Sequence, residues 1–508
     1  MRPRKMPGLS KSKFMAGLQC VKRLYQLCYG YEPLGKPNEG MEAILAQGQE
    51  VGILARQAFP SGVLIDDDHV HHREAEVKTH KLMKDGKVPA IFEAAFTFEN
   101  VRVRADILRR SPGGRWRIIE VKSTSEAKEE HVPDLAIQAY VLKSCGIKVS
   151  STCLMHLDRG YVFDGKVLDV KKLFAIEDLT KKTVAFMKRI PAQLAANWRI
   201  LSLDNPPEVE PGDQCTNPYE CDYYQMCNEE KPSDWIGHLP RISDSRLKHF
   251  LAEGIESIHD LTDPSCLSEI QSRAWRCVRQ GKAYFGPGLR KELASLRHPI
   301  CFMDFETFYP AIPRYRGMRP FDHIPFQWSV HVQRNPASKI EHHEFLADDA
   351  RDPREEFIQK LLMILEGRVE RGFPGKGPIV VYNKSFENSR LDDLARWLPP
   401  YARRIENVKK RIWDLLPVIR KHVYHPRFYG SFSIKSVLPA LILHMTYAGM
   451  EVSDGGEAGL AYAALVQGDL DEPEMLRLKK ALGKYCGQDT LAMVKLTRRL
   501  QGELSRTK

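Results

Sequence analysis

The chain has 508 residues, of which 43% are hydrophobic and 28% are charged, and it carries a net charge of +11. This composition excludes a disordered chain, and the length exceeds what one ordinary core supports, so we expect two or three domains. No apolar run reaches the roughly 18 residues of a membrane helix. The basic start of the chain lacks an apolar signal core, so we expect a cytoplasmic protein without a membrane partner. The positive charge favours a polyanionic partner, nucleic acid first, although a merely basic soluble protein would also carry it.

Residues 1–230 are predicted to form the first domain. Helical spacing dominates its beginning, and residues 90–110 then alternate in the manner of a strand that stops at a Ser-Pro-Gly-Gly turn. Residues 115–124 form a second predicted strand, and residues 134–146 return to helical spacing.

Two acids and a lysine lie among the apolar strand residues of this domain. Asp106 stands in the first strand, whereas Glu120 and Lys122 are two apart in the second and therefore share a face. Burying charges side by side costs free energy unless they pair or hold a metal. Two carboxylates and a lysine can hold a divalent ion and steady a water for attack on phosphorus. A lone Glu-x-Lys on a strand is also common without any function.

The order of the surrounding residues resembles the RecB-like branch of the PD-(D/E)XK nucleases, including CRISPR-associated RecB-type exonucleases with an iron–sulfur cluster. Gln138 and Tyr140 follow the acids, and Glu93 precedes them. The resemblance covers about residues 8–230 and implies a restriction-endonuclease-like fold in which these three residues support the catalytic set. That branch usually has a histidine ligand on an early helix, where this chain has Gly52.

Three cysteines, Cys215, Cys221 and Cys227, stand six residues apart in CTNPYECDYYQMC. The resembled branch adds one cysteine from before the nuclease core, which implies Cys20 here, with Cys28 as a substitute. Four thiolates are the ligand set of a [4Fe–4S] cluster, and they also suit structural zinc. We favour the cluster because tight Cys-x-x-Cys pairs, which are typical of zinc sites, do not occur here.

Residues 231–298 show a helical pattern in which EGIESI resembles the turn of a helix-hairpin-helix unit. Such a turn can present backbone N–H groups to phosphate, although a plain helical spacer would show the same pattern. Residues 299–508 alternate between strand-like and helical segments, which predicts an α/β domain.

Four acids come from three separate segments of this last domain. Asp304 and Glu306 share one strand face in MDFET, Glu387 stands near the start of a helix, and Tyr485 and Asp489 are four apart on one side of another helix. Four converging carboxylates could bind two Mg²⁺ or Mn²⁺ ions. Such a pair stabilises both the attacking and the leaving oxygen in phosphodiester cleavage.

In this order the motifs resemble the DEDD exonucleases of the RNase H-like fold, over about residues 299–505. The resemblance implies a 3′-to-5′ exonuclease in which Tyr485 orients the attacking water. Aspartate is usual where this chain has Glu387. The whole arrangement resembles a bacterial family of uncharacterised proteins that fuse a RecB-like module to an RNase H-like module.

We therefore predict an α/β multidomain protein with a PD-(D/E)XK restriction-endonuclease-like domain, a small helical middle segment and an RNase H-like domain. The predicted function is a metal-dependent nuclease acting on nucleic acid, with single-stranded DNA as the expected substrate. DNA repair, phage defence and RNA turnover are all compatible pathways. Two alternatives stay open: a nucleic-acid-binding scaffold with inactive sites, suggested by Gly52 and Glu387, and an iron–sulfur sensor.

Overall fold

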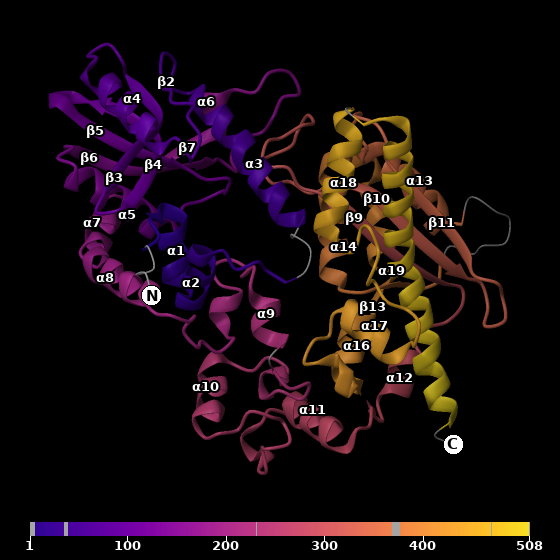
Figure 1. Cartoon of the computed structure of the whole chain (residues 1–508). Coiled ribbons are helices and arrows are strands. Elements are labelled where there is room, and N and C mark those ends of the chain that lie inside the picture. Colours follow the sequence, from indigo (N-terminus) through magenta and orange to yellow (C-terminus); the bar gives the residue numbers. More distant parts are fainter. Residues whose placement is uncertain (1–5, 35–38, 230, 368–375, 469, 507–508) are drawn as a thin grey trace. The chain divides into compact units, whose positions relative to one another are not determined.

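The computed structural model describes residues 6–34, 39–229, 231–367, 376–468 and 470–506 (Figure 1). The protein is a mixed α/β protein with several sheets, as the sequence predicts at this level. The chain divides into two compact units, the first of Met1–Glu230 with Pro310–Asp322 and the second of Lys231–Tyr309 with His323–Lys508. The segment Pro310–Asp322 therefore leaves the second unit, and its Ala311 and Ile312 are buried in a core of the first.

A seven-stranded sheet forms the centre of the first unit, in the order β2-β3-β4-β5-β6-β7, and β1 pairs in parallel with the start of β4. Its strands are β1 (Leu9–Ser10), β2 (Val63–Leu64), β3 (Ala90–Phe98), β4 (Val101–Ser111), β5 (Arg115–Val121), β6 (Val149–Leu157) and β7 (Phe174–Asp178). The stretch 90–110, which we expected to be one strand, is two antiparallel strands. Glu99 and Asn100 both have positive φ, as a two-residue hairpin turn requires, and they reverse the chain between β3 and β4.

Helices cover both faces of this sheet. They are α1 (Lys11–Gln19), α2 (Val21–Tyr29), α3 (Glu39–Arg56), α4 (His72–Lys84), α5 (His131–Ser144), α6 (Val170–Leu173), α7 (Thr180–Met187), α8 (Ile190–Leu201) and α9 (Tyr224–Glu229), with short 3-10 turns η1 (Pro112–Gly114) and η2 (Asp213–Cys215). One core contains α1, α4, α5 and α8, and a second core contains α3. Helix α5 is buried nearly all round, including Asp134 and Gln138. These two polar side chains must therefore find partners inside the protein.

The second unit is built on a five-stranded sheet in the order β11-β10-β9-β12-β13. Its strands are β9 (Ile300–Phe308), β10 (Ile324–Gln333), β11 (Glu341–Leu346), β12 (Ile379–Val381) and β13 (Ile412–Asp414), and a separate pair joins β8 (Tyr284–Phe285) to β14 (Val423–Tyr424). Strands β9, β10 and β11 are antiparallel neighbours, whereas β12 runs parallel to both β9 and β13.

The helices of the second unit pack on both faces of the sheet (Figure 1). They are α10 (Asp244–Ala252), α11 (Glu269–Gln280), α12 (Leu289–Leu293), α13 (Arg354–Leu365), α14 (Lys384–Trp397), α15 (Ala402–Lys409), α16 (Leu415–His422), α17 (Ile434–Leu441), α18 (Gly455–Gln467) and α19 (Glu472–Arg506), with 3-10 turns η3 (Ile236–His238), η4 (Pro264–Cys266), η5 (Pro399–Tyr401) and η6 (Pro426–Phe428). Helices α13, α14 and α15 share a core with one sheet face, and α18 and α19 share the other core with α16 and α17.

Two glycines of the long helix α19 face the sheet. A Cβ atom on Gly483 would lie 3.5 Å from a carboxylate oxygen of Glu344, and one on Gly487 would lie 3.4 Å from the ring of His342. Both neighbours belong to β11. Because the glycines are four apart, they lie on one side of the helix, where an added Cβ would make ordinary van der Waals contact with β11. The same turns of α19 carry Tyr485 and Asp489.

The predicted middle segment 231–298 belongs to the second unit and shares a core with α16–α19. The helix-hairpin-helix expectation is wrong, because in this fully described segment no helix follows EGIESI directly. Helix α10 ends at Ala252, and α11 begins only at Glu269, with irregular chain and η4 between them. A paired helix hairpin needs two helices joined by a short turn.

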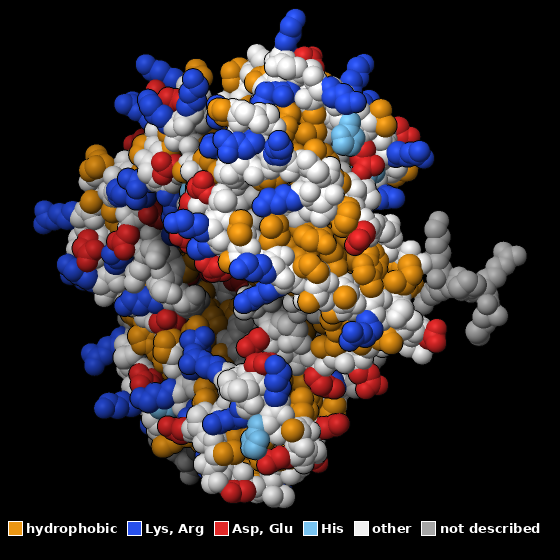
Figure 2. Space-filling model, turned by 90° about the vertical axis from the view of Figure 1, so that its left-hand side faces the viewer, with side chains coloured by type: hydrophobic (Ala, Val, Ile, Leu, Met, Phe, Trp, Pro, Cys, Tyr) orange, Lys and Arg blue, Asp and Glu red, His pale blue; other side chains and the backbone are white. Residues whose placement is uncertain are grey.

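On the face shown in Figure 2, Lys and Arg side chains stand among acidic and apolar ones. Among the helices that the structure describes, none has the length and apolarity to cross a membrane.

Candidate active sites

Four acidic side chains of the second unit converge from one strand and two helices. Asp304 and Glu306 come from β9, Glu387 from the first turn of α14, and Asp489 from α19. Glu306, Glu387 and Asp489 are buried. The ligand atoms of Asp304, Glu306 and the neighbouring Cys486 all lie within 4.8 Å of one another. The four acids are called the acid cluster below.

Mutual repulsion marks the acid cluster. Burial, followed by the charge of Asp489, raises the pKa of Asp304 well above its usual range. Burial, followed by the charges of Asp304 and Asp489, does the same to the pKa of Glu306. The pKa of Glu387 is raised by burial and then by Asp304. The charges of Asp304 and Asp489 therefore make their neighbours harder to ionise, and a cation among the carboxylates would relieve that cost.

Two tyrosines hold Asp489 in the acid cluster. Tyr447 donates its hydroxyl proton to Oδ1 of Asp489, and Tyr485, one helical turn earlier on α19, also hydrogen-bonds to this carboxylate. Burial and the nearby carboxylates raise the pKa of both tyrosines, so both hydroxyls stay protonated and remain donors. Burial still raises the pKa of Asp489 to about 6, although these hydrogen bonds and the charge of Lys435 lower it.

The donor atoms of the acid cluster fit a hard divalent cation. Oε2 of Glu387 is buried and, within the described part of the chain, has no hydrogen-bond partner. An unsatisfied buried carboxylate oxygen costs free energy, and oxygen ligands are those that Mg²⁺ prefers. Cys486, which lies beside the acid cluster, is not a hard oxygen ligand. Burial and the neighbouring acids raise the pKa of its thiol well above the usual value.

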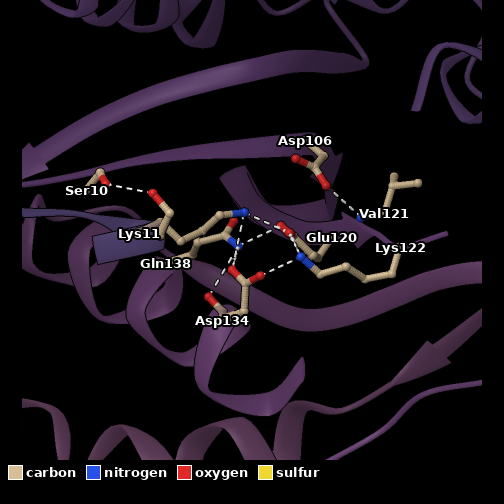
Figure 3. Close-up of polar contacts among 9 residues, drawn as sticks. Ser10, Lys11, Asp106, Glu120, Val121, Lys122, Asp134 and Gln138 are labelled. Carbon is tan, nitrogen blue, oxygen red and sulfur yellow. Dashed lines mark hydrogen bonds and ion pairs between the residues drawn. The ribbon is translucent and has the colours of Figure 1, made fainter. Parts of the chain in front are cut away.

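The predicted residues Glu120, Lys122 and Gln138 meet in the first unit, together with two residues that the sequence did not indicate, Lys11 and Asp134 (Figure 3). Nζ of Lys122 lies 2.7 Å from Oε1 of Glu120 and 2.6 Å from Oδ2 of Asp134. Nζ of Lys11 lies 2.7 Å from the same Glu120 oxygen and 3.2 Å from Oδ1 of Asp134. The amide of Gln138 donates to Oε2 of Glu120 at 2.7 Å.

Asp106 stands beside this network on β4 and accepts a 2.7 Å hydrogen bond from the backbone N–H of Val121 (Figure 3). Burial and the charge of Glu120 raise the pKa of Asp106 to about 7, against the opposing effect of the two lysines. Burial also opposes ionisation of Lys11 and Asp134, but their opposite charges outweigh it. The pKa of Lys11 is therefore raised and that of Asp134 is lowered.

Two predicted supporting residues lie elsewhere. Glu93 has a positive φ, and its carboxylate pairs with Arg56 at 3.1 Å. Tyr140 packs its ring edge-on against Phe98, with centroids 6.1 Å apart. Residues two apart on an α-helix point in directions about 200° apart, so Tyr140 cannot join Gln138 at Glu120. The interpretation of Tyr140 as part of this site is therefore corrected.

Asp134 had a usable sequence signal, because it stands one helical turn before Gln138 and both are polar residues in an apolar helix. Lys11 had none, since 109 residues separate it from Glu120. The position of the usual histidine, Gly52, offers no ligand atom, and a Cβ added there would meet nothing within 4 Å.

This network fits a divalent cation less well than the acid cluster does. The charges of Glu120 and Asp134 are already balanced by Lys11 and Lys122 at ion-pair distance. A metal ion would have to displace at least one ammonium group from buried carboxylates, which costs several kcal/mol of pairing.

Cys20, Cys215, Cys221 and Cys227 line one small cavity of the first unit, together with Arg23. A tetrahedral zinc site places its sulfur atoms about 3.8 Å apart, given Zn–S bonds of about 2.3 Å. Among the described residues, no three of these sulfur atoms lie within 4.8 Å of one another. These sulfur atoms are therefore not arranged as a closed tetrahedral zinc site.

Cys28, the possible substitute for Cys20, does not line this cavity and packs against the apolar core instead. The side chain of Gln19, the neighbour of Cys20, donates hydrogen bonds to the carbonyls of Gln214 and Tyr219 at 2.7 and 2.6 Å. These bonds hold the end of α1 against the segment that carries the other three cysteines.

Comparison with known proteins identifies relatives of uncharacterised function. Residues 301–433 match the family described as "Domain of unknown function (DUF2779)", a segment that includes Asp304, Glu306 and Glu387. The chain is 26% identical over 237 residues to "Uncharacterized protein MG366 homolog" of Mycoplasma pneumoniae, covering 44% of this chain and 35% of that protein. It is 25% identical over 156 residues to "Uncharacterized protein UU173" of Ureaplasma parvum serovar 3, covering 29% of this chain and 22% of that protein. The matches thus span about a third or less of the length of these relatives.

Among solved structures, one titled "Crystal structure of SSO0001" matches 45% of this chain and 89% of its own. The identity is 12% and the TM-score is 0.21, which is too low to define a shared fold.

Proposed function

We propose that the chain is a metal-dependent nuclease whose principal site is the acid cluster. The observation that carries this proposal is the convergence of four carboxylates, three of them buried, without a balancing lysine or arginine at ion-pair distance among the described residues. Buried charges are retained in proteins when they are paired or bind metal.

The residues of the acid cluster have distinct roles in this proposal. Asp304, Glu306, Glu387 and Asp489 would hold Mg²⁺ or Mn²⁺, which supply stabilisation of the attacking and leaving oxygens in phosphodiester cleavage. Tyr447 and Tyr485 fix the carboxylate of Asp489 by hydrogen bonds. The Tyr485 hydroxyl, which also feels the charge of Glu306, is suited to orient a water.

Lys435 adds a positive charge at the edge of the acid cluster. Its side chain is exposed, and its charge lowers the pKa of both Glu306 and Asp489. A mobile ammonium at the edge of an anionic site can contact a substrate phosphate without neutralising the acids. This arrangement supports a phosphodiester substrate, and we propose single-stranded DNA.

The second unit, a mixed sheet with helices on both faces, is proposed to be an RNase H-like exonuclease domain. The first unit is proposed to be a PD-(D/E)XK domain, because its Asp106, Glu120, Lys122 and Gln138 stand in the order and neighbourhood that such a site requires. Its cysteine cavity is proposed to hold a structural [4Fe–4S] cluster.

The first unit has a second candidate role, as a nucleic-acid-binding module without cleavage. The observation that favours it is the pairing of Glu120 and Asp134 with Lys11 and Lys122, which leaves little negative charge for a metal.

A cleavage assay with three variants tests both roles. End-labelled single-stranded DNA and RNA are incubated with Mn²⁺ or EDTA and with the wild type, Asp304→Ala, Asp106→Ala or the control Asp348→Ala. Asp348 is an exposed acid of the second unit, paired with Lys479 at 2.7 Å. We expect Asp304→Ala to lose about 100-fold or more of the activity, the size of effect that one electrostatic group has in catalysis, and Asp348→Ala to lose none.

Cleavage by Asp304→Ala at the wild-type rate would refute the assignment of the principal site, as would a wild type that is inactive with every divalent ion. Loss of activity in Asp304→Ala alone would leave the first unit as a binding module, whereas loss of a separate activity in Asp106→Ala would make it a second nuclease.

A further inference from the structure

A pocket of about 610 Å³ opens beside the Glu120 network in the first unit. It is formed by β1, the start of α1, the beginning of β4 and the segment before α4. Lys11, Lys13, Arg102 and Arg104 line it, and no acidic residue among the described ones does. The pocket is called the basic pocket below.

Two of its cations have no carboxylate partner. In the described part of the chain, neither Lys13 nor Arg102 makes an ion pair, and the side chain of Arg102 is exposed. Arg104 is held in place differently: its guanidinium donates to the backbone carbonyls of Asp67 and Asp68 at 2.6 and 2.7 Å, which neutralises no charge. The basic pocket therefore keeps a net positive charge, and the complementary ligand is an anion.

Lys11 joins the basic pocket to the Glu120 network. Its side chain lines the pocket, and its ammonium group reaches Glu120 and Asp134 at 2.7 and 3.2 Å. A ligand in the basic pocket therefore lies next to the lysine that pairs with these carboxylates. The sugar–phosphate backbone of a bound strand would run from the pocket past Lys11 to the proposed cleavage site.

Size and lining indicate which part of a nucleic acid would bind. A volume of about 610 Å³ lies in the range that buries one small-molecule ligand, so one or two nucleotides fit and a double helix does not. The described lining contains no Phe, Tyr or Trp on which bases could stack. Contacts would thus be made to phosphates by lysine and arginine, independently of base sequence.

We propose that the basic pocket binds backbone phosphates of single-stranded nucleic acid and leads the strand to the Glu120 network. The proposal deepens the proposed function and rests on it for the identity of the ligand. It assigns Lys13 and Arg102 as phosphate contacts, with Arg104 fixed beside them.

Binding of a fluorescent thymidine 12-mer to the full-length protein, measured by anisotropy in EDTA over a series of salt concentrations, tests the proposal. EDTA stops metal-dependent cleavage, so binding is read separately from catalysis. The variants are Lys13→Gln, Arg102→Gln and the double variant, with Arg109→Gln as the matched control. Arg109 is on the same strand as Arg102, lies outside the pocket and stacks over the Phe59 ring at 5.6 Å.

We expect each pocket variant to weaken binding several-fold and to reduce the slope of log K against log salt by about 0.7, the value for one phosphate contact on a single strand. The double variant should lose about twice that slope, and Arg109→Gln should match the wild type. Thermal unfolding of all variants checks that they are folded.

Wild-type affinity and slope in the double variant would overturn the proposal, and so would a wild type that does not bind the oligonucleotide. Competition by inorganic phosphate as effective as that by unlabelled oligonucleotide would also overturn it, in favour of a small-anion site. A wild type that binds but never cleaves refutes the nuclease and leaves the basic pocket standing. Normal cleavage with unaffected binding by the variants refutes the pocket alone.

Discussion

Replacing Asp489 by asparagine should stabilise the metal-free protein while removing its response to metal. Burial raises the pKa of Asp489 from 3.8 to about 6 in the folded protein. Between those values the folded state keeps a proton that the unfolded chain releases, so stability falls as the pH rises through this window. The pKa difference of about two, at 1.36 kcal/mol per pH unit, makes the ionised carboxylate cost about 3 kcal/mol above pH 6.

Asparagine has nearly the same shape, accepts a hydrogen bond from Tyr447 and carries no charge. The Asp489→Asn variant should therefore equal the wild type near pH 4 and exceed its free energy of unfolding by about 3 kcal/mol at pH 7 to 8. Urea unfolding in EDTA at five pH values measures this difference, with Asp348→Asn as an exposed control.

Adding Mn²⁺ should reverse the order of stability. An ion present at 100 times its dissociation constant stabilises the folded wild type by about 2.7 kcal/mol, and the variant should gain much less. If Asp489→Asn is no more stable than the wild type at pH 8 in EDTA, or gains as much from Mn²⁺, then the acid cluster is not a set of repelling metal ligands.

Three further outcomes are expected. In an Mn²⁺-supported cleavage assay, Zn²⁺ and Cd²⁺ should inhibit the wild type at least tenfold more strongly than Cys486→Ser, because the sulfur of Cys486, once a bound metal displaces its proton, is a ligand that selects soft metals; equal inhibition constants would contradict a thiol contact. After anaerobic reconstitution, Cys227→Ser should lose the bound iron and visible absorbance that Cys28→Ser retains, and equal iron contents would count against the four-cysteine site. Gly52→Ala should raise the free energy of unfolding by about 1 kcal/mol, because the residue is helical and its Cβ would meet open space. Gly30→Ala, at a φ of +70°, should lower the free energy of unfolding by about 1 kcal/mol. If urea unfolding shows both variants to be stabilised, or both to be destabilised, the backbone assignment of one of these glycines is wrong.

Local spacing explains which site residues could be predicted. Glu120 and Lys122 are two apart on β5 and are hydrogen-bonded at 2.7 Å. Tyr485 and Asp489 are one helical turn apart on α19 and hydrogen-bond to each other. In both pairs the period of the strand or helix alone brings the two side chains together, so a few residues of sequence are enough to predict the contact. The same rule, applied to Gln138 and Tyr140, places them on opposite sides of their helix from the sequence alone.

Contacts between distant segments could not be predicted in this way. Lys11 reaches Glu120 across 109 residues, and Tyr447 reaches Asp489 across 42. Neither partner carries a sequence pattern of its own, because lysines at the start of a helix and tyrosines in loops are common at protein surfaces, and only the fold buries Tyr447. The transfer of Pro310–Asp322 to the first unit is of the same kind, since burial of Ala311 and Ile312 depends on a surface built by other segments.

By itself, the sequence determined the mixed α/β character, the strand and helix positions of most candidate acids, and the residue types available for chemistry. These follow from periodicity and side-chain chemistry within one or two turns of chain. Only the tertiary structure decided that Glu120 and Asp134 are neutralised by lysines while the acid cluster is not. Charge balance depends on which distant side chains the packing brings within about 4 Å, and the Coulomb energy that separates the two sites weakens as that distance grows.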